Sequence, residues 1–517
     1  MTNKKMTKVS EKMDLLFRYV VLVLFGIFVF YLLMVSLFTT NYSFVGRKVI
    51  FASDSPWKVP LAVVLLMCIV LVIKKYELAG LYEKYRERLH RIVSLLLLLF
   101  MLFLIVATQL QPHGDQLAIS NAAVGLRTYD FELFVDGSYF VYWPFQSRIV
   151  VFLWAFFKIF GNLNYPAFQI MNAFCILISL ELLAKIAVRT GIAEGKNGET
   201  LTFIGCALFL PYLFYVTFIY GNIIGLMFMV AAIYMQVRYV QEHKLAYLAG
   251  VVVFCAVGVW LKNTYLIFLV AILVFLLVDF WKEWRVANLA GMICVVAAVT
   301  LLGNLSDAVV EHRLGFPLTE GSPMIAWVTM AFGEDEEGNP VKFDGYNRDV
   351  YLENNLDTEK AAQEAAEELK RRLADLMEDP MHMMNFMRKK IAIAWNEPTH
   401  ESLVANNRPE TRIEQSELTR WILCEDEKSP VVEYMNLFHG MLLAGTLCWL
   451  ILKGKWTNIY GLLPAVIFIG GFLFQLFWET YSQYTIQYYL LIIPYAVSGY
   501  IEVADRLEQK FANMGQV

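Results

Sequence analysis

The sequence predicts an all-α, polytopic membrane protein, and its composition and the spacing of its apolar segments carry this prediction. Of the 517 residues, 58% are apolar and 17% are charged, and the mean hydropathy is +0.51. Soluble domains usually carry about a quarter charged residues, so these values disfavour a soluble enzyme with one large core. The same values exclude a disordered chain. A net charge of −4 lacks the basic surplus that a nucleic-acid partner requires.

Apolar segments long enough to cross a membrane occupy most of the chain. A transmembrane helix needs about 20 predominantly apolar residues. About twelve crossings are predicted, near residues 15–38, 59–74, 92–110, 166–188, 200–219, 221–240, 245–261, 263–280, 286–303, 432–452, 457–477 and 484–503. The segment 149–160 is apolar but short. We interpret it as a short helix at the outer membrane face, and the alternative is a full thirteenth span.

Lysine and arginine in short loops predict the orientation, because cytoplasmic loops carry an excess of both. The N-terminal lysines and the basic loop 74–91 are therefore expected in the cytoplasm, as is the C-terminus. Counting spans from these markers places five elements outside: 111–148, 220–222, 262–263, 304–431 and 478–483. The chain is thus expected to be a multi-pass protein of the cell membrane, with its active site on the extracytoplasmic side.

Five regions follow from this topology. They are N-terminal transmembrane helices (1–110), a first outer loop with interfacial helices (111–165), a central transmembrane bundle (166–303), an extracytoplasmic soluble region (304–431), and C-terminal transmembrane helices with a cytoplasmic tail (432–517). Within the soluble region we expect a helix over 358–377 with Thr358 as its N-cap. Pro380 should end that helix, and a second amphipathic helix should follow over 381–396.

The first outer loop carries the leading catalytic candidate. Asp115 follows directly after a span, between His113 and Gln116, and so lies close to the hydrocarbon boundary. A carboxylate in this position can accept a proton from a hydroxyl that attacks a lipid-borne electrophile. The alternative is that Asp115 caps the amphipathic helix expected over 117–127. No CxxC or HExxH pattern is present, so neither a metal nor another cofactor is predicted.

Further polar residues are expected on the same membrane face. Lys262 and Asn263 end one span, Glu479 and Gln483 precede another, and Arg148 follows the Asp115 loop. Charged groups near a span are costly and often mark function. A single lysine or arginine can also extend to the lipid headgroups as an anchor. The location of all these residues on one membrane face is therefore what indicates a functional site.

Several short motifs occur in a characteristic order. They are His113-Gly114-Asp115-Gln116, Tyr142-Trp143-Pro144-Phe145-Gln146, Gln169 with Asn172, Tyr220-Gly221-Asn222, Leu261-Lys262-Asn263, Trp327-Val328-Thr329-Met330, Gly345-Tyr346-Asn347, Trp395-Asn396-Glu397-Pro398 and the segment 470–484. In this order and sidedness they resemble membrane glycosyltransferases of the GT-C fold. The resemblance is strongest to bacterial relatives of the protein O-mannosyltransferase family (glycosyltransferase family 39-like), and it covers roughly residues 90–500.

The resemblance implies a GT-C-like bundle of about 12–13 transmembrane helices with a helical loop domain on the outer face. It implies transfer of a sugar from a polyprenyl-phosphate donor to an acceptor hydroxyl, with inversion and with Asp115 as the catalytic base. The acceptor would be a glycan, a lipid or a protein. Lys262 and Arg148 are the candidates to stabilise the leaving phosphate. The other substrate-binding candidates are His113, Gln116, Tyr142, Tyr220, Asn222, Asn263, Glu479, Gln483 and Tyr484.

One position departs from the family pattern. Family members often carry Glu-x-x-x-Arg-Tyr before the last span, and here Gln483 stands in place of the arginine. A different donor, a shifted cation or a non-catalytic member of the fold would each account for it. Two other functions remain open: a transporter or lipid-linked glycan flippase, and a glycan polymerase or ligase. A transporter often shows internal repeats, which this sequence lacks.

Overall fold

The computed structural model describes residues 2–44, 49–75, 78–135, 137–407 and 414–514. Within these ranges the chain is mostly helical, as the sequence predicts. One small sheet is added: β1 (Thr39–Tyr42) pairs with β2 (Ile50–Ser53) in antiparallel register, with Thr39 opposite Ser53. This hairpin follows the first helix and contacts the residue after the helix Pro380–Trp395, through the bond from the Asn41 amide to the Asn396 carbonyl.

Seven helices in the described part of the chain are long and apolar enough to cross a membrane. They lie in α1 (Thr2–Phe38), α3 (Leu78–Thr108), α7 (Tyr165–Arg189), α10 (Gly221–Glu242), α12 (Leu266–Glu283), α13 (Val286–Leu314) and α20 (Pro430–Leu452). Two bent helix pairs raise the number to nine if each forms one span: Glu132–Tyr142 with Pro144–Phe160, and Gly195–Ala207 with Leu210–Thr217. The protein is therefore a multi-pass membrane protein.

This number is smaller than the twelve crossings expected from hydropathy, because four apolar segments are short or broken and because the helix Ile486–Met514, which covers the predicted span 484–503, is not among the seven. Three of them form apolar helices of 10–17 residues, Lys58–Ile73, Leu245–Leu261 and Ile459–Gln475. These correspond to α2 (Lys58–Lys75), α11 (Leu245–Leu261) and α21 (Leu463–Gln475) with the short turn before it. The predicted span 200–219 is divided between α8 (Gly195–Ala207) and α9 (Leu210–Phe214), with a bend of 62°.

The helix over the segment 149–160 agrees with its interpretation as a short helix. α6 (Ser147–Phe160) has 14 residues, about 21 Å at 1.5 Å per residue. The hydrocarbon layer is about 30 Å thick. The apolar segment Pro144–Phe160 also turns by 110° from the segment before it. α6 packs against α4 (Asp115–Thr128) and against α13.

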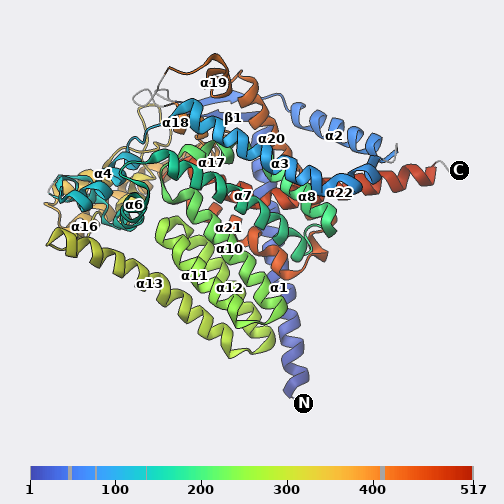
Figure 1. The fold of residues 1–517 in the computed structure, drawn as a ribbon, viewed down its shortest axis with the longest axis horizontal. Helices are drawn as coiled ribbons and strands as arrows, with labels where there is room; N and C mark the ends of the chain where they lie inside the picture. Colours follow the sequence, from blue (N-terminus) through green and yellow to red (C-terminus); the bar gives the residue numbers. More distant parts are fainter. Residues whose placement is uncertain (1, 45–48, 76–77, 136, 408–413, 515–517) are drawn as a thin grey trace.

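The central helices form one packed bundle. α10 and α11 pack along each other, α7 packs against α10, and α20 packs against α22 (Ile486–Met514). α13 runs obliquely along the outside of α11 and α12 (Figure 1). It continues to Leu314, eleven residues beyond the predicted end of the bundle at 303.

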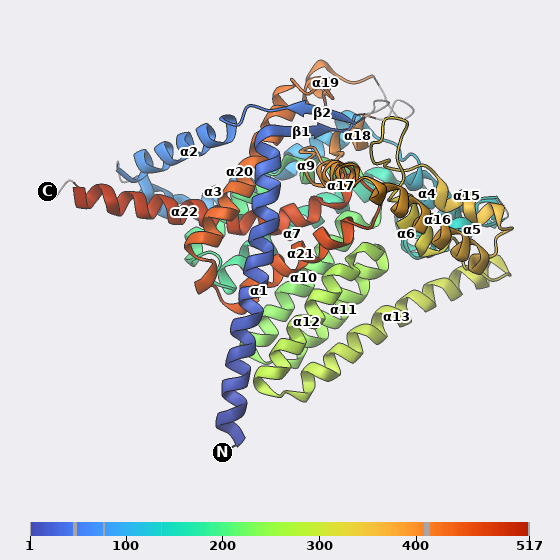
Figure 2. The same ribbon diagram turned by 180° about the vertical axis from the view of Figure 1, so that it is seen from behind.

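The outer region comprises α14 (Met324–Met330), α15 (Tyr346–Glu353), α16 (Thr358–Glu378), α17 (Pro380–Trp395), α18 (Ser402–Asn406) and α19 (Glu417–Ile422). Of these, α15 and α16 lie beside α4, the short helix α5 and α6, whereas α18 and α19 lie near the β-hairpin (Figure 2). A small apolar core joins the outer region to α5 (Tyr139–Tyr142), because Val141 and Tyr142 pack with Ala326 and Tyr351. The outer region is therefore built directly onto the first outer loop.

The two expected helices of this region form, but the predicted cap is wrong. Asp357, not Thr358, is the N-cap of α16, and its carboxylate accepts from the backbone amides of Glu359 and Lys360. Thr358 is the first helical residue, and its hydroxyl donates to the Gly321 carbonyl at 2.8 Å. Aspartate is also a favoured N-cap residue, so the cap lies one position earlier than the sequence pattern suggested.

Candidate active site

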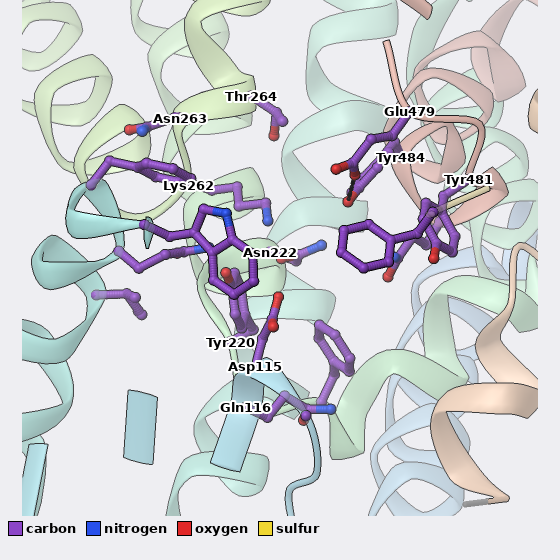
Figure 3. A pocket seen from close by; sticks show the side chains of 18 of the residues that line it. Asp115, Gln116, Tyr220, Asn222, Lys262, Asn263, Thr264, Glu479, Tyr481 and Tyr484 are labelled. Atoms are coloured by element: carbon purple, nitrogen blue, oxygen red, sulfur yellow. Dashed lines mark hydrogen bonds between the residues drawn. The ribbon is translucent and has the colours of Figure 1, made fainter. Parts of the chain in front are cut away.

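A cavity of about 510 Å³ lies where α4, the turns beside α10 and α11, the outer region and the loop before α22 meet. Ten of the twelve site residues that the sequence predicts line it: His113, Asp115, Gln116, Tyr220, Asn222, Lys262, Asn263, Glu479, Gln483 and Tyr484. Figure 3 shows Asp115 and Lys262 pointing toward one another, with Glu479 and Tyr484 entering from a different side. Residues that are more than 350 positions apart in sequence thus share one cavity.

Asp115 faces the cavity from the first turn of α4. The N-cap of this helix is Gly114, whose φ of 52° lies in the left-handed region that glycine tolerates. No side chain caps the helix, so the structure does not support the alternative role of Asp115 as a cap. The carboxylate is open to the cavity and accepts a hydrogen bond from the Tyr139 hydroxyl.

Gln116 connects the Asp115 helix to the neighbouring turn. Its side chain is buried, and its Oε1 accepts from the Ile219 amide at 2.7 Å. Gln169 on α7 reinforces the same connection, because its Nε2 donates to the carbonyls of Leu110 and Thr217. Asn172, one turn further along α7, donates to the carbonyls of Val216 and Phe218. These buried amides satisfy backbone groups of Leu110 and of residues 216–219, and they thereby hold the segments that lead to Asp115 and Tyr220.

The Tyr220-Gly221-Asn222 turn lies against the end of α11. A Cβ atom at Gly221 would lie 1.9 Å from the Leu261 carbonyl oxygen, so only glycine permits this approach. The approach brings Tyr220 next to Lys262, whose Nζ lies 4.3 Å from the centre of the Tyr220 ring. A lysine ammonium over an aromatic face is attracted by the ring quadrupole, which partly replaces lost hydration.

Glu479 forms another wall of the cavity. It lies between α21 and α22 and is 8% exposed. The Tyr484 hydroxyl donates to its Oε2 at 2.9 Å, and the Trp327 indole also hydrogen-bonds to its carboxylate. Glu479 therefore joins the outer region, through Trp327, to the start of the last helix, through Tyr484.

The surrounding protein partly desolvates all three charged groups and so changes their pKa values. Desolvation raises the pKa of Asp115, although Lys262 and the bond from Tyr139 oppose this. Desolvation also raises the pKa of Glu479 to about 7 and lowers the pKa of Lys262 to about 8, with Asp115 and Glu479 opposing the second shift. A carboxylate with a raised pKa is a stronger base at neutral pH. The cavity therefore holds a base and a cation whose pKa values are both shifted toward neutral pH.

Two predicted site residues do not line the cavity. Arg148 pairs with Asp307 on α13, with 3.6 Å between Nη2 and Oδ2, and its guanidinium packs against Gly303. The greater length of α13 brings Asp307 to this position, which the predicted helix end at 303 did not anticipate. Tyr142 is buried in the small core that joins α5 to the outer region. The structure therefore leaves Lys262 as the one lysine or arginine among the described residues that line the cavity.

Several lining residues were absent from the predicted set. They include Tyr139, Trp143, Trp327, Glu401, Trp478 and Tyr481. The Trp327 and Trp478 rings are parallel within 1°, with centroids 6.3 Å apart. Trp143 and Trp327 belong to motifs that the sequence shows, but only the fold brings them to the cavity. No group of three or more His, Cys, Asp or Glu side chains suited to a metal ion occurs in the described ranges.

No curated protein matches the sequence. A solved structure of the archaeal oligosaccharyltransferase AglB from Archaeoglobus fulgidus, in complex with an inhibitory peptide and a dolichol-phosphate, is similar with a TM-score of 0.43 and 12% identity. That similarity covers 84% of this chain and 52% of the other, so the chain spans about half the length of that protein.

A family model gives the second similarity. Residues 148–305 match the family described as dolichyl-phosphate-mannose-protein mannosyltransferase. The matched segment includes Tyr220, Asn222 and Lys262, and it ends before Glu479. This match agrees with the resemblance that the motifs predicted, and it shows a similarity to the dolichyl-phosphate-mannose-protein mannosyltransferase family over residues 148–305.

Proposed function

We propose that the protein transfers a sugar from a polyprenyl-phosphate donor to an acceptor hydroxyl at the outer face of the membrane, with inversion. The observation that carries this proposal is the placement of Asp115 and Lys262 on one cavity, each pointing toward the other (Figure 3). The description of the matching family, which names a dolichyl-phosphate sugar, supports the donor class. A base and a cation on one cavity meet the two chemical needs of this reaction.

Asp115 is the general base in this proposal. Its carboxylate takes the proton of the acceptor hydroxyl as the hydroxyl oxygen bonds to the anomeric carbon of the donor. The bond between the anomeric carbon and the phosphate oxygen breaks, and its electron pair stays on the polyprenyl phosphate that leaves. Attack from the side opposite the phosphate inverts the anomeric centre. The bond from Tyr139 holds the carboxylate in one orientation.

Lys262 stabilises the charge that develops on the leaving phosphate. A preorganised cation stabilises negative charge that develops in the transition state, and the Tyr220 ring holds the Lys262 ammonium in place. Since Arg148 is engaged with Asp307 outside the cavity, we assign the phosphate to Lys262 alone. The position of Gln483 on the cavity lining means that the departure from the family pattern falls within the site itself.

The decisive experiment is the substitution Asp115→Asn. Membranes containing the full-length protein would receive a panel of radiolabelled polyprenyl-phosphate hexoses, and label transferred to acceptor would be measured. Loss of a general base typically costs about 10²- to 10⁴-fold in rate, with protein levels unchanged. Asp130→Asn, at an exposed aspartate after the same helix, is the matched control. Normal transfer by the Asp115→Asn protein would disprove the assignment.

A further inference from the structure

A lysine of the outer region is buried behind the Glu479 wall of the cavity. Lys390 lies on α17 and is 1% exposed. Its ammonium donates three hydrogen bonds of 2.8 Å each, to the Ala331 carbonyl, the Trp478 carbonyl and the Thr480 hydroxyl. An ammonium has three donors, so the geometry uses its full capacity.

Burial of this ammonium carries a desolvation cost. Moving an ammonium out of water disfavours its charged form, and burial lowers the pKa of Lys390 to about 7. The charge that opposes this shift is that of Glu479. A buried apolar residue would fill the same space without the desolvation cost, so packing alone does not account for a lysine here.

The bonded partners reveal what Lys390 holds. Two of the three acceptors, Trp478 and Thr480, are the immediate neighbours of Glu479 in sequence. The stretch 478–481 has no regular secondary structure, so no helical or strand hydrogen bonds fix its backbone. Ala331, the third acceptor, directly follows α14, which carries Trp327. One ammonium, that of Lys390, therefore hydrogen-bonds both to the segment that carries Trp327 and to the segment that carries Glu479.

We propose that Lys390 is a positioning residue that fixes the backbone on both sides of Glu479 and so couples the outer region to the donor side of the cavity. This inference rests on the proposed function. Glu479 and Lys262 interact across the cavity, so displacement of Glu479 disturbs the headgroup end of the donor before it disturbs the acceptor. Lys390 touches no substrate, and its effect is transmitted entirely through the 478–480 segment.

A double-mutant cycle tests this coupling. Lys390→Met is expected to raise the donor KM about tenfold, a loss of about 1.4 kcal/mol, and to leave the acceptor KM within about twofold. In the Glu479→Gln background the same substitution should add little, because coupled residues act non-additively. Lys389→Met is the matched control, since Lys389 donates instead to Asn339 within the outer region. An additive cycle, or equal effects on both substrates, would overturn the inference.

A second measurement does not depend on transfer activity. A cysteine at position 479 should react slowly with a soluble maleimide, because Glu479 is 8% exposed. Adding Lys390→Met should accelerate the reaction at least about fivefold by releasing the segment, whereas Lys389→Met should not. If Lys390→Met does not fold, Thr480→Val removes one acceptor and should give a smaller acceleration. An unchanged rate rejects the Lys390 inference, while absence of transfer by the unmodified protein rejects only the proposed function.

Discussion

The Lys262 ammonium lies 4.3 Å from the centre of the Tyr220 ring, and the two residues come from different helix ends. Tyr220 precedes α10 and Lys262 follows α11. The contact depends on Gly221, which allows the backbone of the two helices to meet at the Leu261 carbonyl. Gly221, which has no side chain, therefore helps to position the Lys262 ammonium against Tyr220.

The first prediction concerns the pH dependence of transfer. The pKa of Lys262 is lowered to about 8 by burial, so its charge is present below that pH and is lost as the pH rises through about 8. If the charge stabilises the leaving phosphate, kcat/KM falls over the same range. Lys262→Arg should move this fall to higher pH, because arginine stays protonated. Asp115, Glu479, Tyr220 and Tyr484 are the titratable groups that face Lys262.

The measurement is a profile of kcat/KM against pH for the unmodified and Lys262→Arg proteins, with Lys389→Arg as the control. The acidic side of the profile reports Asp115 together with Glu479, because burial raises the pKa of both carboxyl groups, that of Glu479 to about 7. Identical alkaline limbs for the unmodified and Lys262→Arg proteins would show that Lys262 does not supply the essential charge.

The second prediction concerns Gly221→Ala. Its Cβ would meet the Leu261 carbonyl oxygen at 1.9 Å, and the backbones of α10 and α11 would have to separate. Overpacking of this kind typically costs about 1–3 kcal/mol, and here it would also displace Tyr220 from Lys262. We expect a lower thermal midpoint in detergent together with a raised donor KM. Gly26→Ala on α1 is the control, because a Cβ added there meets no atom within 4 Å; equal behaviour of the two variants would contradict the prediction.

Most helix positions could be predicted because apolar length and loop charge are local features of sequence. The bounds of α7, α10 and α11 agree with the predicted spans to within two residues. The end of α13 was missed because residues 304–314 are polar enough to resemble a loop, yet they continue a helix that packs on α6. Hydropathy locates the apolar part of a helix, whereas tertiary contacts decide where the helix ends.

The site was predictable where one residue lies beside a span and unpredictable where side chains reach between elements. Asp115 and Lys262 follow apolar segments directly, so their position near the membrane face could be inferred. Lys390 occurs in an amphipathic helix next to Lys389, from which the sequence does not distinguish it, and only the three-dimensional structure shows its bonds to residues 88 and 90 positions away. Arg148 was misplaced for the converse reason, since its partner Asp307 lies on a part of α13 that the sequence assigned to a loop.

The third prediction follows from that placement of Arg148. Because Arg148 pairs with Asp307 and does not line the cavity, Arg148→Met should change the donor KM by less than about twofold. It should instead weaken the packing of α6 on α13, and Asp307→Asn should act in the same direction. Donor kinetics and thermal midpoints of both variants provide the check. A donor KM raised about tenfold or more in Arg148→Met alone would contradict this prediction and would indicate that Arg148 contributes to phosphate binding.

The fourth prediction concerns the side of the membrane on which the site opens. Positive charge in the loop 74–91 predicts a cytoplasmic position for Lys84, and the outer region that carries Glu336 is predicted to lie on the opposite side. Both side chains are exposed, so a cysteine at either position can react with an aqueous reagent. In a background with Cys424→Ser, Glu336→Cys should react with an impermeant maleimide in intact cells, and Lys84→Cys only after the cells are made permeable. The reverse pattern would place the Asp115 cavity on the cytoplasmic side, where a donor on the outer leaflet could not reach it.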